Sequence, residues 1–258
     1  MSDLIGSRMI ISNGDVLSYL AKGLMYTIII SLVAILLSLV FGAILALARN
    51  YCNRGPKRIL GVLSAVYIEV FRNTPLMLWM FICFLFCPAP VFSKKLAVAI
   101  GLTSTVDVKM LFKAMVALTL FTSSVMAEII RGGLNSVAHG QFEASQSQGF
   151  SAFFMMRKII LPQAFHNIVP TLLSQMITTI KDSSYMASLA TIELMARVKL
   201  IISKANKYNG TWLGPMNRGT IHVSDVFVLF GLAFLTYFII NFSLSLVVRR
   251  LKKKRKPA

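Results

Sequence analysis

The sequence has 258 residues, of which 56% are hydrophobic and only 14% are charged. This balance places the chain in the membrane class rather than among soluble globular proteins. Lys and Arg outnumber Asp and Glu by 27 to 9. No nucleic-acid-binding motif accompanies this charge, so we expect an anionic membrane surface or an acidic protein as its partner, and no nucleic acid.

The first predicted crossing follows a short lead, Met1–Lys22. The next 26 residues, Gly23–Ala48, carry no charge, and a spanning helix needs only about 20 residues. Small side chains in this stretch suit close helix packing: Ser31, Ser38, Gly42, Ala43 and Ala46. The following segment, Arg49–Arg58, holds four basic residues in ten. By the positive-inside rule this segment is cytoplasmic, which places the N-terminus outside.

The second apolar stretch, Ile59–Phe92, is interrupted by Asn73-Thr74-Pro75. A residue that precedes proline avoids helical geometry, so we expect Thr74 to cap a new helix that starts at the proline. Two arrangements remain open. In one, Ile59–Arg72 lies at the membrane interface and only Pro75–Phe92 crosses. In the other, which we favour, one long helix is broken within the membrane, as in the substrate sites of many transporters.

Three further crossings are expected downstream. Met110–Ile130 is the third, and its Lys113 and Glu128 must face protein or reach the interface. His166–Glu193 is the fourth, although it contains several polar residues. Val226–Val248 is the fifth and is uncharged for 23 residues. The sequence therefore predicts an all-α integral membrane protein with five transmembrane helices.

The polar connections define the orientation of these crossings. Ser93–Lys113 and Arg197–Val223 are expected outside, and the tail Arg249–Lys256, with seven basic residues in eight, is expected in the cytoplasm. Counted this way, fourteen Lys and Arg lie inside and eleven outside. The basic external loops either dock an acidic surface on a substrate-delivering protein or are simply solvated.

A polar segment, Arg131–Pro162, separates the third and fourth crossings, and we call it the docking segment. The positions of its glycine and proline residues predict that the segment is ordered and is not a solvated loop. Gln141–Gln148 is prone to form a helix, and Gly149 stands where a helix end favours left-handed backbone. Phe150–Ile160 is again helical in character, and Pro162 suits the first turn of the next helix. A protruding helical segment of this kind suits a docking surface.

The docking segment also carries a spaced motif: Glu143-Ala144-Ser145, Gly149 six residues after the Glu, and Ile159-x-Leu161-Pro162. This spacing resembles the EAA loop of ATP-binding-cassette (ABC) importer permeases. Four flanking motifs resemble the polar-amino-acid branch of that family: Ala127–Gly133, Gly140-Gln141, Pro162–Phe165 and Lys181–Ser184. The similarity runs from about Lys22 to Val248. Ser145 stands where the family usually has alanine, and both residues are small.

The resemblance implies the type I ABC importer permease fold in a bacterial cytoplasmic membrane, with the C-terminus in the cytoplasm. It implies one permease domain, residues 23–248, between the lead 1–22 and the tail 249–258. Two such chains, identical or similar, would form one translocation path for glutamine, glutamate or a similar amino acid. An external binding protein would deliver the amino acid. Five residues would dock on a separate ATPase dimer: Gly140, Gln141, Glu143, Ala144 and Gly149.

That ATPase dimer would bind the ATP and magnesium, since this chain has no phosphate-binding loop. The chain also lacks a nucleophile elbow, a His-Glu-x-x-His pair and any spacing of cysteines or histidines that suits a metal. We therefore expect a transporter subunit with no catalytic residue, no metal site and no cofactor of its own. The alternative is a self-sufficient ion-coupled amino-acid carrier, which does not explain the docking segment.

Charged residues within the crossings mark a candidate substrate pathway. A charge at a helix centre costs roughly 2.5–3.5 kcal/mol on insertion scales, so such residues are functional candidates by default. The carboxylate of an amino acid would meet Lys181, Arg72 or the helix start at Thr74. Its ammonium would meet Asp182 or Glu69, with two hydroxyl groups nearby, those of Ser183 and Ser184.

The same charges have a purely structural interpretation. Glu69 and Arg72 are three residues apart and are expected to share a helix face and to pair. Lys181 and Asp182 are adjacent and point about 100° apart on a helix, so they are poor partners for each other. Ion pairs that only hold helices together remain an open alternative for all of these charges.

Overall fold

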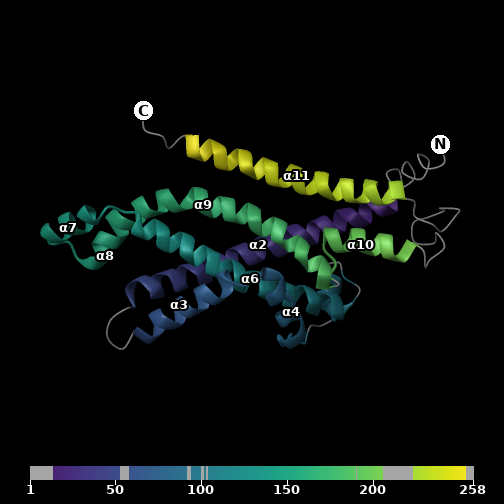
Figure 1. Cartoon of the computed structure of the whole chain (residues 1–258), viewed down its shortest axis with the longest axis horizontal. Helices are drawn as coiled ribbons and strands as arrows, with labels where there is room; N and C mark the ends of the chain where they lie inside the picture. Colours follow the sequence, from purple (N-terminus) through teal and green to yellow (C-terminus); the bar gives the residue numbers. More distant parts are fainter. Residues whose placement is uncertain are drawn as a thin grey trace. The chain divides into compact units, whose positions relative to one another are not determined.

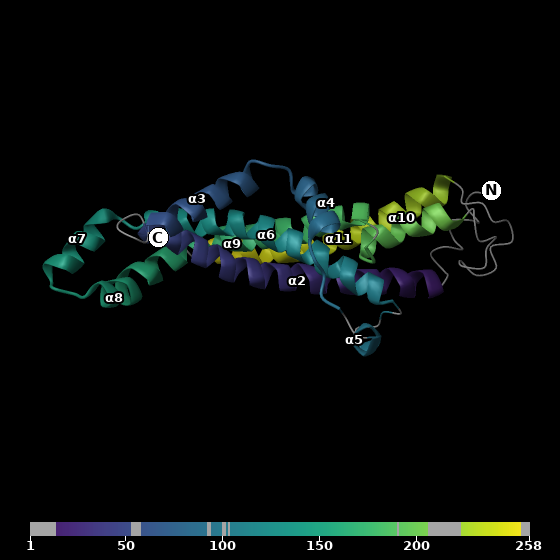
Figure 2. The same ribbon diagram turned by 90° about the horizontal axis from the view of Figure 1, so that it is seen from below.

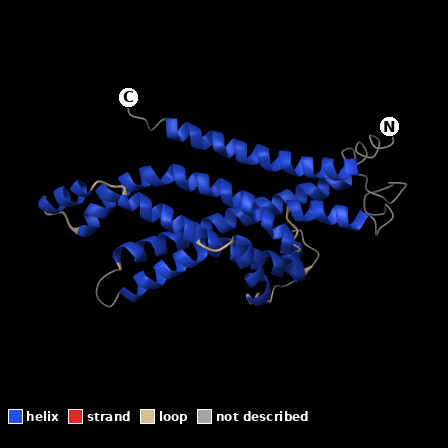
Figure 3. Ribbon diagram, viewed as in Figure 1, coloured by secondary structure: helices blue, strands red, loops and turns tan. Residues whose placement is uncertain are grey.

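The computed structural model describes residues 14–52, 58–91, 94–99, 102, 104–189, 191–205 and 223–253. Within these residues the secondary structure is helical and contains no strand (Figures 1 and 3). The predicted all-α class is therefore confirmed. The chain divides into two compact units. Unit 1 comprises Met1–Val33, Met80–Ala117 and Ile180–Ser243, and unit 2 comprises Ala34–Trp79, Leu118–Thr179 and Leu244–Ala258.

Three of the described helices are long and apolar enough to cross a membrane: α2 (Gly14–Tyr51), α6 (Thr105–Asn135) and α11 (Val223–Lys253). They contain the predicted first, third and fifth crossings. The helix α2 begins before Lys22, so the end of the predicted lead is helical.

Two predicted crossings take a different form. The helices α3 (Arg58–Arg72) and α4 (Leu76–Phe86) are apolar enough only as a pair, which is bent by 108°. The helix α9 (Leu161–Asp182) covers much of the predicted fourth crossing, but its polar side chains keep it out of the set of apolar spans. Within the described residues, composition thus supports three spans, or four with the bent pair, and the fourth crossing, His166–Glu193, stays a prediction.

Unit 1 is built around α10 (Leu194–Ala205), which packs against the first part of α2 and against α11. One buried apolar core joins the three helices: Val16, Leu20, Leu194, Val198, Ile201, Leu229 and Ala233. The expectation of a polar external loop from Arg197 was wrong at its start, because apolar side chains at helical spacing fold this stretch into α10. The remainder of that loop, residues 206–222, lies outside the described residues.

Unit 1 also contains two short elements. The helix α5 (Lys94–Ala99) occupies part of the predicted external segment Ser93–Lys113, and η3 (Ser183–Leu189) is a 3₁₀ helix that continues directly from α9. Lys113 donates a hydrogen bond from Nζ to the carbonyl oxygen of Phe84 at 2.8 Å. This lysine therefore faces protein, as predicted for a charge within a crossing.

Unit 2 brings the second part of α2, α3 and α6 into close contact. A Cβ atom placed on Gly42 of α2 would lie 2.8 Å from Met126 Cβ and 2.9 Å from the carbonyl oxygen of Ser123. The two backbones therefore meet almost directly. The Ser38 hydroxyl donates to the carbonyl oxygen of Thr119 at 3.0 Å. The predicted close packing of small residues in the first crossing is confirmed at these positions.

The docking segment of unit 2 is helical. It comprises the end of α6, α7 (His139–Ser147), α8 (Ala152–Met155) and a π-helical turn, η2 (Met156–Ile160), which runs directly into α9. In Figures 1 and 2 the helices α7 and α8 lie side by side beyond the adjoining ends of α6 and α9. The predicted succession of a short helix, a glycine and a second helix is confirmed.

Candidate functional site

The end of α7 shows why Gly149 is needed. Gly149 has φ +74°, the left-handed region in which glycine alone meets no Cβ penalty. Its N–H donates to the carbonyl oxygen of Gln146 at 2.9 Å, and the N–H of Phe150 donates to the carbonyl oxygen of Ser145 at 3.1 Å. This pair of bonds is a Schellman motif, which closes the helix and turns the chain toward α8. The predicted left-handed helix end at Gly149 is confirmed.

A small apolar core holds the docking segment to its flanking helices. Six buried side chains from α6, α8, η2, α9 and the α6–α7 connection form it: Leu134, Val137, Met155, Ile160, Ala164 and Ile168. A Cβ atom on Gly133 would lie 1.9 Å from Ile168 Cγ1, so only glycine fits where α9 crosses the end of α6. The segment is therefore an ordered extension of two helices and not a solvated loop.

The outer surface of this extension is open. The five predicted docking residues are all exposed in the described structure: Gly140, Gln141, Glu143, Ala144 and Gly149. Glu143 Oε1 lies 3.1 Å from His139 Nδ1, one turn earlier on α7. By contrast Ser145, the departure from the family pattern, is buried, and its hydroxyl donates to the carbonyl oxygen of Gln141. The hydroxyl is thus accommodated inside the helix and leaves the exposed face unchanged.

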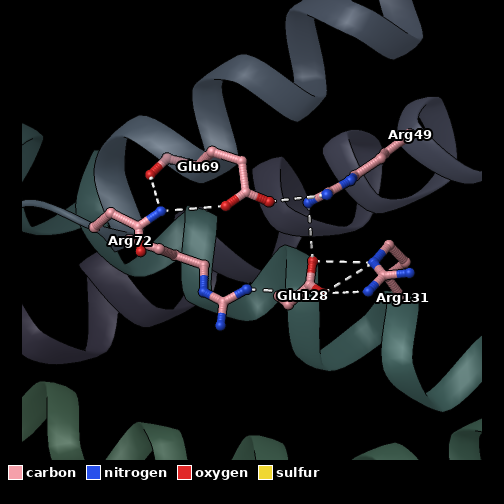
Figure 4. Close-up of polar contacts among 6 residues, drawn as sticks. Arg49, Glu69, Arg72, Glu128 and Arg131 are labelled. Carbon is pink, nitrogen blue, oxygen red and sulfur yellow. Dashed lines mark hydrogen bonds and ion pairs between the residues drawn. The ribbon is translucent and has the colours of Figure 1, made fainter.

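A network of charged side chains lies elsewhere in unit 2 (Figure 4). Its centre is Glu128 of α6, which meets guanidinium groups from three helices. Arg131 donates from Nε to both carboxylate oxygens at 3.0 Å. Arg49 of α2 donates from Nη1 at 3.2 Å, and Arg72 of α3 has its Nη1 at 3.7 Å. Arg49 also donates from Nη2 to Glu69 of α3 at 2.9 Å. We call these five residues the Glu128 network.

The Glu128 network corrects one prediction. Glu69 and Arg72 do not pair with each other, because each takes a partner from another helix. The structural interpretation of these charges is therefore supported, since the ion pairs join α2, α3 and α6. However, 53% of the Glu69 side chain and 40% of the Arg72 side chain remain exposed to solvent. The network carries three positive and two negative charges.

The break between α3 and α4 has an internal structure of its own. The Thr74 hydroxyl donates to the carbonyl oxygen of Val70 at 2.7 Å and accepts from Trp79 Nε1 at 2.6 Å. The Trp79 ring stacks on Phe71, with the ring centroids 4.0 Å apart. Thr74 therefore satisfies a carbonyl at the end of α3 and does not cap α4 as predicted. The break itself, with α4 beginning just after Pro75, agrees with the sequence.

The predicted polar group at the end of α9 belongs to unit 1. Lys181 is exposed and Asp182 is half-buried, and no ion pair joins them to each other or to another described residue. Ser183 is fully buried, and its hydroxyl donates to the carbonyl oxygen of Ile180 at 2.7 Å. Ser184, next in the 3₁₀ helix, is half-buried. Lys181 is therefore the most accessible of these four pathway candidates.

Sequence reasoning missed a second carboxylate, Glu193, which is completely buried in unit 1. It caps α10, accepting from the backbone N–H groups of Met195 at 2.8 Å and Ala196 at 2.6 Å. The Tyr237 hydroxyl of α11 donates to it at 3.2 Å, and the Thr27 hydroxyl of α2 lies 3.4 Å away. We call this group the Glu193 cap. A carboxylate just before an apolar helical run is the signal that could have revealed it.

Arg197 makes further contacts in the same region of unit 1. Its guanidinium donates to the carbonyl oxygens of Ile192 and Tyr19, both at 2.8 Å, and lies 4.1 Å from the Tyr19 ring centroid. This arginine was counted among the basic residues of an external loop. Its partners bury it, so it is not available to dock an acidic protein surface.

Among the described residues no group of three or more His, Cys, Asp and Glu side chains could hold a metal ion. Within the same residues, Cys52, Cys83 and Cys87 are free thiols.

Comparisons with known proteins agree with this arrangement. Residues 38–257 match the family described as the binding-protein-dependent transport system inner membrane component. A probable glutamine ABC transporter permease protein of Bacillus subtilis (strain 168) is 33% identical over 93% of this chain and 94% of its own length. A glutamate/aspartate import permease protein of Escherichia coli O6:H1 is 32% identical over 92% of this chain and 94% of its own length.

Solved structures share the fold. A chain from an amino acid ABC transporter crystallised with histidines has a TM-score of 0.66 at 24% sequence identity, covering 90% of this chain and 94% of that one. A chain from the MetNI methionine ABC transporter in an inward-facing conformation has a TM-score of 0.62 at 18% identity, covering 92% and 98%. Members of the matched family are permease subunits and are not themselves enzymes. The chain belongs to the binding-protein-dependent transport system inner membrane component family, the permeases of ABC importers.

Proposed function

We propose that this chain is the transmembrane subunit of an ATP-driven importer of glutamine, glutamate or a similar polar amino acid. Two copies, or this chain and a similar one, form the translocation path in a bacterial cytoplasmic membrane. The chain crosses the membrane five times as a single permease domain, with the N-terminus outside and the C-terminus in the cytoplasm. An external binding protein delivers the amino acid.

The docking segment supports this proposal most directly. Its five candidate residues are exposed on a helical extension whose own core is apolar and buried. A rigid, solvent-facing helix at the junction of two long helices can transmit a push from a partner to both of them. In the proposed cycle, ATP binding closes the ATPase pair and draws the docking segments together, which turns the path outward. Hydrolysis resets the path inward.

Substitution Glu143→Lys tests the coupling. Because Glu143 is exposed and bonded only within α7, reversing its charge should leave the fold intact while opposing a basic rim on the ATPase. We expect at least a tenfold loss of substrate-stimulated ATP hydrolysis, and loss of the ATPase subunit when the permease is purified from native membranes. Lys94→Glu, an exposed charge reversal in α5, is the matched control and should retain both.

The carrier alternative predicts a different outcome. A self-sufficient carrier would move an amino acid in vesicles under an ion gradient with no ATPase present, and Glu143→Lys would not impair it. Family membership does not favour this alternative. Transport by the purified chain alone would overturn the proposed function.

A further inference from the structure

The helix α11 presents a row of aromatic side chains to its surroundings. Between residues 227 and 247 its exposed side chains are apolar, except for Ser243, whose hydroxyl is bonded within the helix. Phe238 stacks on Phe234 and on Phe242, with ring centroids 6.1 and 5.4 Å apart. These three rings are 66%, 52% and 44% exposed in the order Phe234, Phe238 and Phe242. We call them the phenylalanine ladder. It is an ordered apolar face.

The basic end of α11 lies on the same side of the helix. The helix continues to Lys253, and Arg249 and Arg250 are exposed. Since successive residues of an α-helix are about 100° apart, the three ladder residues fall within about 60° of Arg249 around the helix axis. The opposite side of α11 carries the residues that pack in the core of unit 1 and Tyr237 of the Glu193 cap. The ladder and Arg249 therefore form one outward face of a single continuous helix (Figure 1).

The length of this face matches one leaflet of a bilayer. At a rise of 1.5 Å per residue, Arg249 lies about 16 Å from Phe238 and about 22 Å from Phe234 along the helix. Half of the hydrocarbon core of a typical bilayer is about 15 Å thick. With Arg249 among the lipid headgroups, the phenylalanine ladder lies beside the acyl chains of the same leaflet.

The charge of the basic end requires an anionic partner from outside the chain. Seven of the eight residues Arg249–Lys256 are basic, and the sequence contains no Asp or Glu after Asp225. The three carboxylates of unit 2 already have partners of their own: Glu69, Glu128 and Glu143. Basic clusters that directly follow a transmembrane helix attract anionic lipid headgroups, and arginine forms strong charge-assisted hydrogen bonds with phosphate.

We propose that this face of α11 binds an anionic phospholipid, with the headgroup phosphate at Arg249 and Arg250 and an acyl chain along the phenylalanine ladder. Two other occupants fit less well. A cytoplasmic protein can reach the arginines but not a ladder inside the hydrocarbon layer. A second copy of this chain, packed across a two-fold axis, would bring two strongly basic tails together with no acidic residue between them. The proposal goes beyond the proposed function, because it holds whichever solute is carried.

The test uses two phospholipid probes that carry the same photoactivatable diazirine in an acyl chain. One has a phosphatidylglycerol headgroup and the other a phosphatidylcholine headgroup. Each is added in trace amount to phosphatidylcholine vesicles that contain the full chain with the subunits that purify with it. After illumination, the adducts on α11 peptides are quantified by mass spectrometry. We expect the anionic probe to label residues 234–246 about tenfold more than the zwitterionic probe, because each arginine at the surface strengthens the binding of anionic lipid.

Charge variants test the headgroup contact. Replacing Arg249 and Arg250 together by glutamine should reduce the preference for the anionic probe to about twofold or less. Replacing Lys94 and Lys95 by glutamine removes the same charge from two exposed positions of α5 and should leave the preference unchanged. The preference is a ratio measured on one protein, so the yield of a variant does not affect it. If the arginine variant does not fold, the natural chain is measured at rising salt, where screening should lower the preference.

Truncations of the ladder test the acyl-chain contact. Phe238→Ala with Phe242→Ala should lower the labelling by the anionic probe about threefold, since apolar contact area is lost. Phe227→Ala is the matched control. Its ring is 73% exposed on the same side of α11, but it lies about 33 Å from Arg249, beyond the reach of one leaflet.

Two results would overturn the proposal. Equal labelling by both probes in the natural chain would show that α11 meets lipid without selecting its headgroup. A lack of labelling by either probe is the result expected if a second copy or another protein covers the ladder.

Discussion

Glu128 and Glu193 are two carboxylates of the same chain that differ in burial and in the kind of group that binds them. Glu128 in unit 2 meets three guanidinium groups and remains 20% exposed, whereas Glu193 in unit 1 is fully buried and meets only backbone N–H groups and hydroxyls. The first accepts hydrogen bonds from positively charged guanidinium groups, so charge attraction adds to its bonds. The second accepts only from neutral donors and has no counter-charge. The comparison separates a carboxylate held by opposite charge from one held by neutral hydrogen bonds alone.

Loss of the Glu193 cap should have the largest effect. Glu193→Ala leaves the N–H groups of Met195 and Ala196 and the Tyr237 hydroxyl without their acceptor, and each unsatisfied buried group costs about 1–3 kcal/mol. We expect the free energy of unfolding to fall by about 3 kcal/mol or more. The apparent thermal unfolding midpoint in detergent should fall by roughly 6–12 °C.

Two companion variants calibrate that measurement. Glu193→Gln keeps one acceptor oxygen and should lose about half as much stability. Glu143→Ala removes an exposed carboxylate of the same size and should stay within about 0.5 kcal/mol of wild type. A Glu193→Ala protein as stable as Glu143→Ala would show that the buried cap is not needed.

Breaking the Glu128 network should have an intermediate effect that a second substitution relieves. Glu128→Ala leaves Arg49, Arg72 and Arg131 to repel one another, at a cost of about 2 kcal/mol in unfolding free energy, as for a lost hydrogen bond to a charged group. Adding Arg131→Gln removes one of the three positive charges and should restore at least half of that loss. A double variant no more stable than Glu128→Ala, compared by thermal unfolding, would contradict a charge-held network.

The smallest effect is expected at the edge of the same network. Glu69→Gln removes a carboxylate that is 53% exposed and bonded to Arg49, so the loss should lie within about 0.2–1 kcal/mol. It should shrink toward zero between 50 mM and 500 mM salt, because mobile ions screen exposed charges. Glu69→Gln and Glu193→Ala are therefore measured across the same range. Glu193→Ala should lose the same unfolding free energy at every salt concentration.

Local patterns in the sequence were sufficient for much of the fold. Uncharged runs located three long helices, the proline at position 75 located the break before α4, and Gly149 located the turn between α7 and α8. Each of these features depends on residues that are neighbours in the chain, and propensity and periodicity report on such neighbours directly.

The partners of polar side chains could not be predicted from local sequence patterns in the same way. Glu69 and Arg72 satisfy the rule for a pair on one helix, yet each binds a residue from a distant part of the chain. Glu193 caps α10 through the N–H groups of its own neighbours, but it also bonds to hydroxyl groups of α2 and α11, which lie more than 40 residues away in the chain.

The π-helical turn at Met156–Ile160 makes the length of the docking segment a constraint. There the N–H of Leu161 bonds to the carbonyl oxygen of Met156, so the turn holds one residue more than an α-helical turn would. A π-helical turn absorbs its extra residue locally, so the helix on either side keeps its alignment. A residue removed from or inserted into the adjoining α-helix would instead rotate everything before it by about 100° relative to the rest of α9. The exposed residues of α7 would then face a new direction while keeping their chemistry. Along this stretch the number of residues therefore matters more than their identity, and variation by substitution is better tolerated than variation by insertion or deletion.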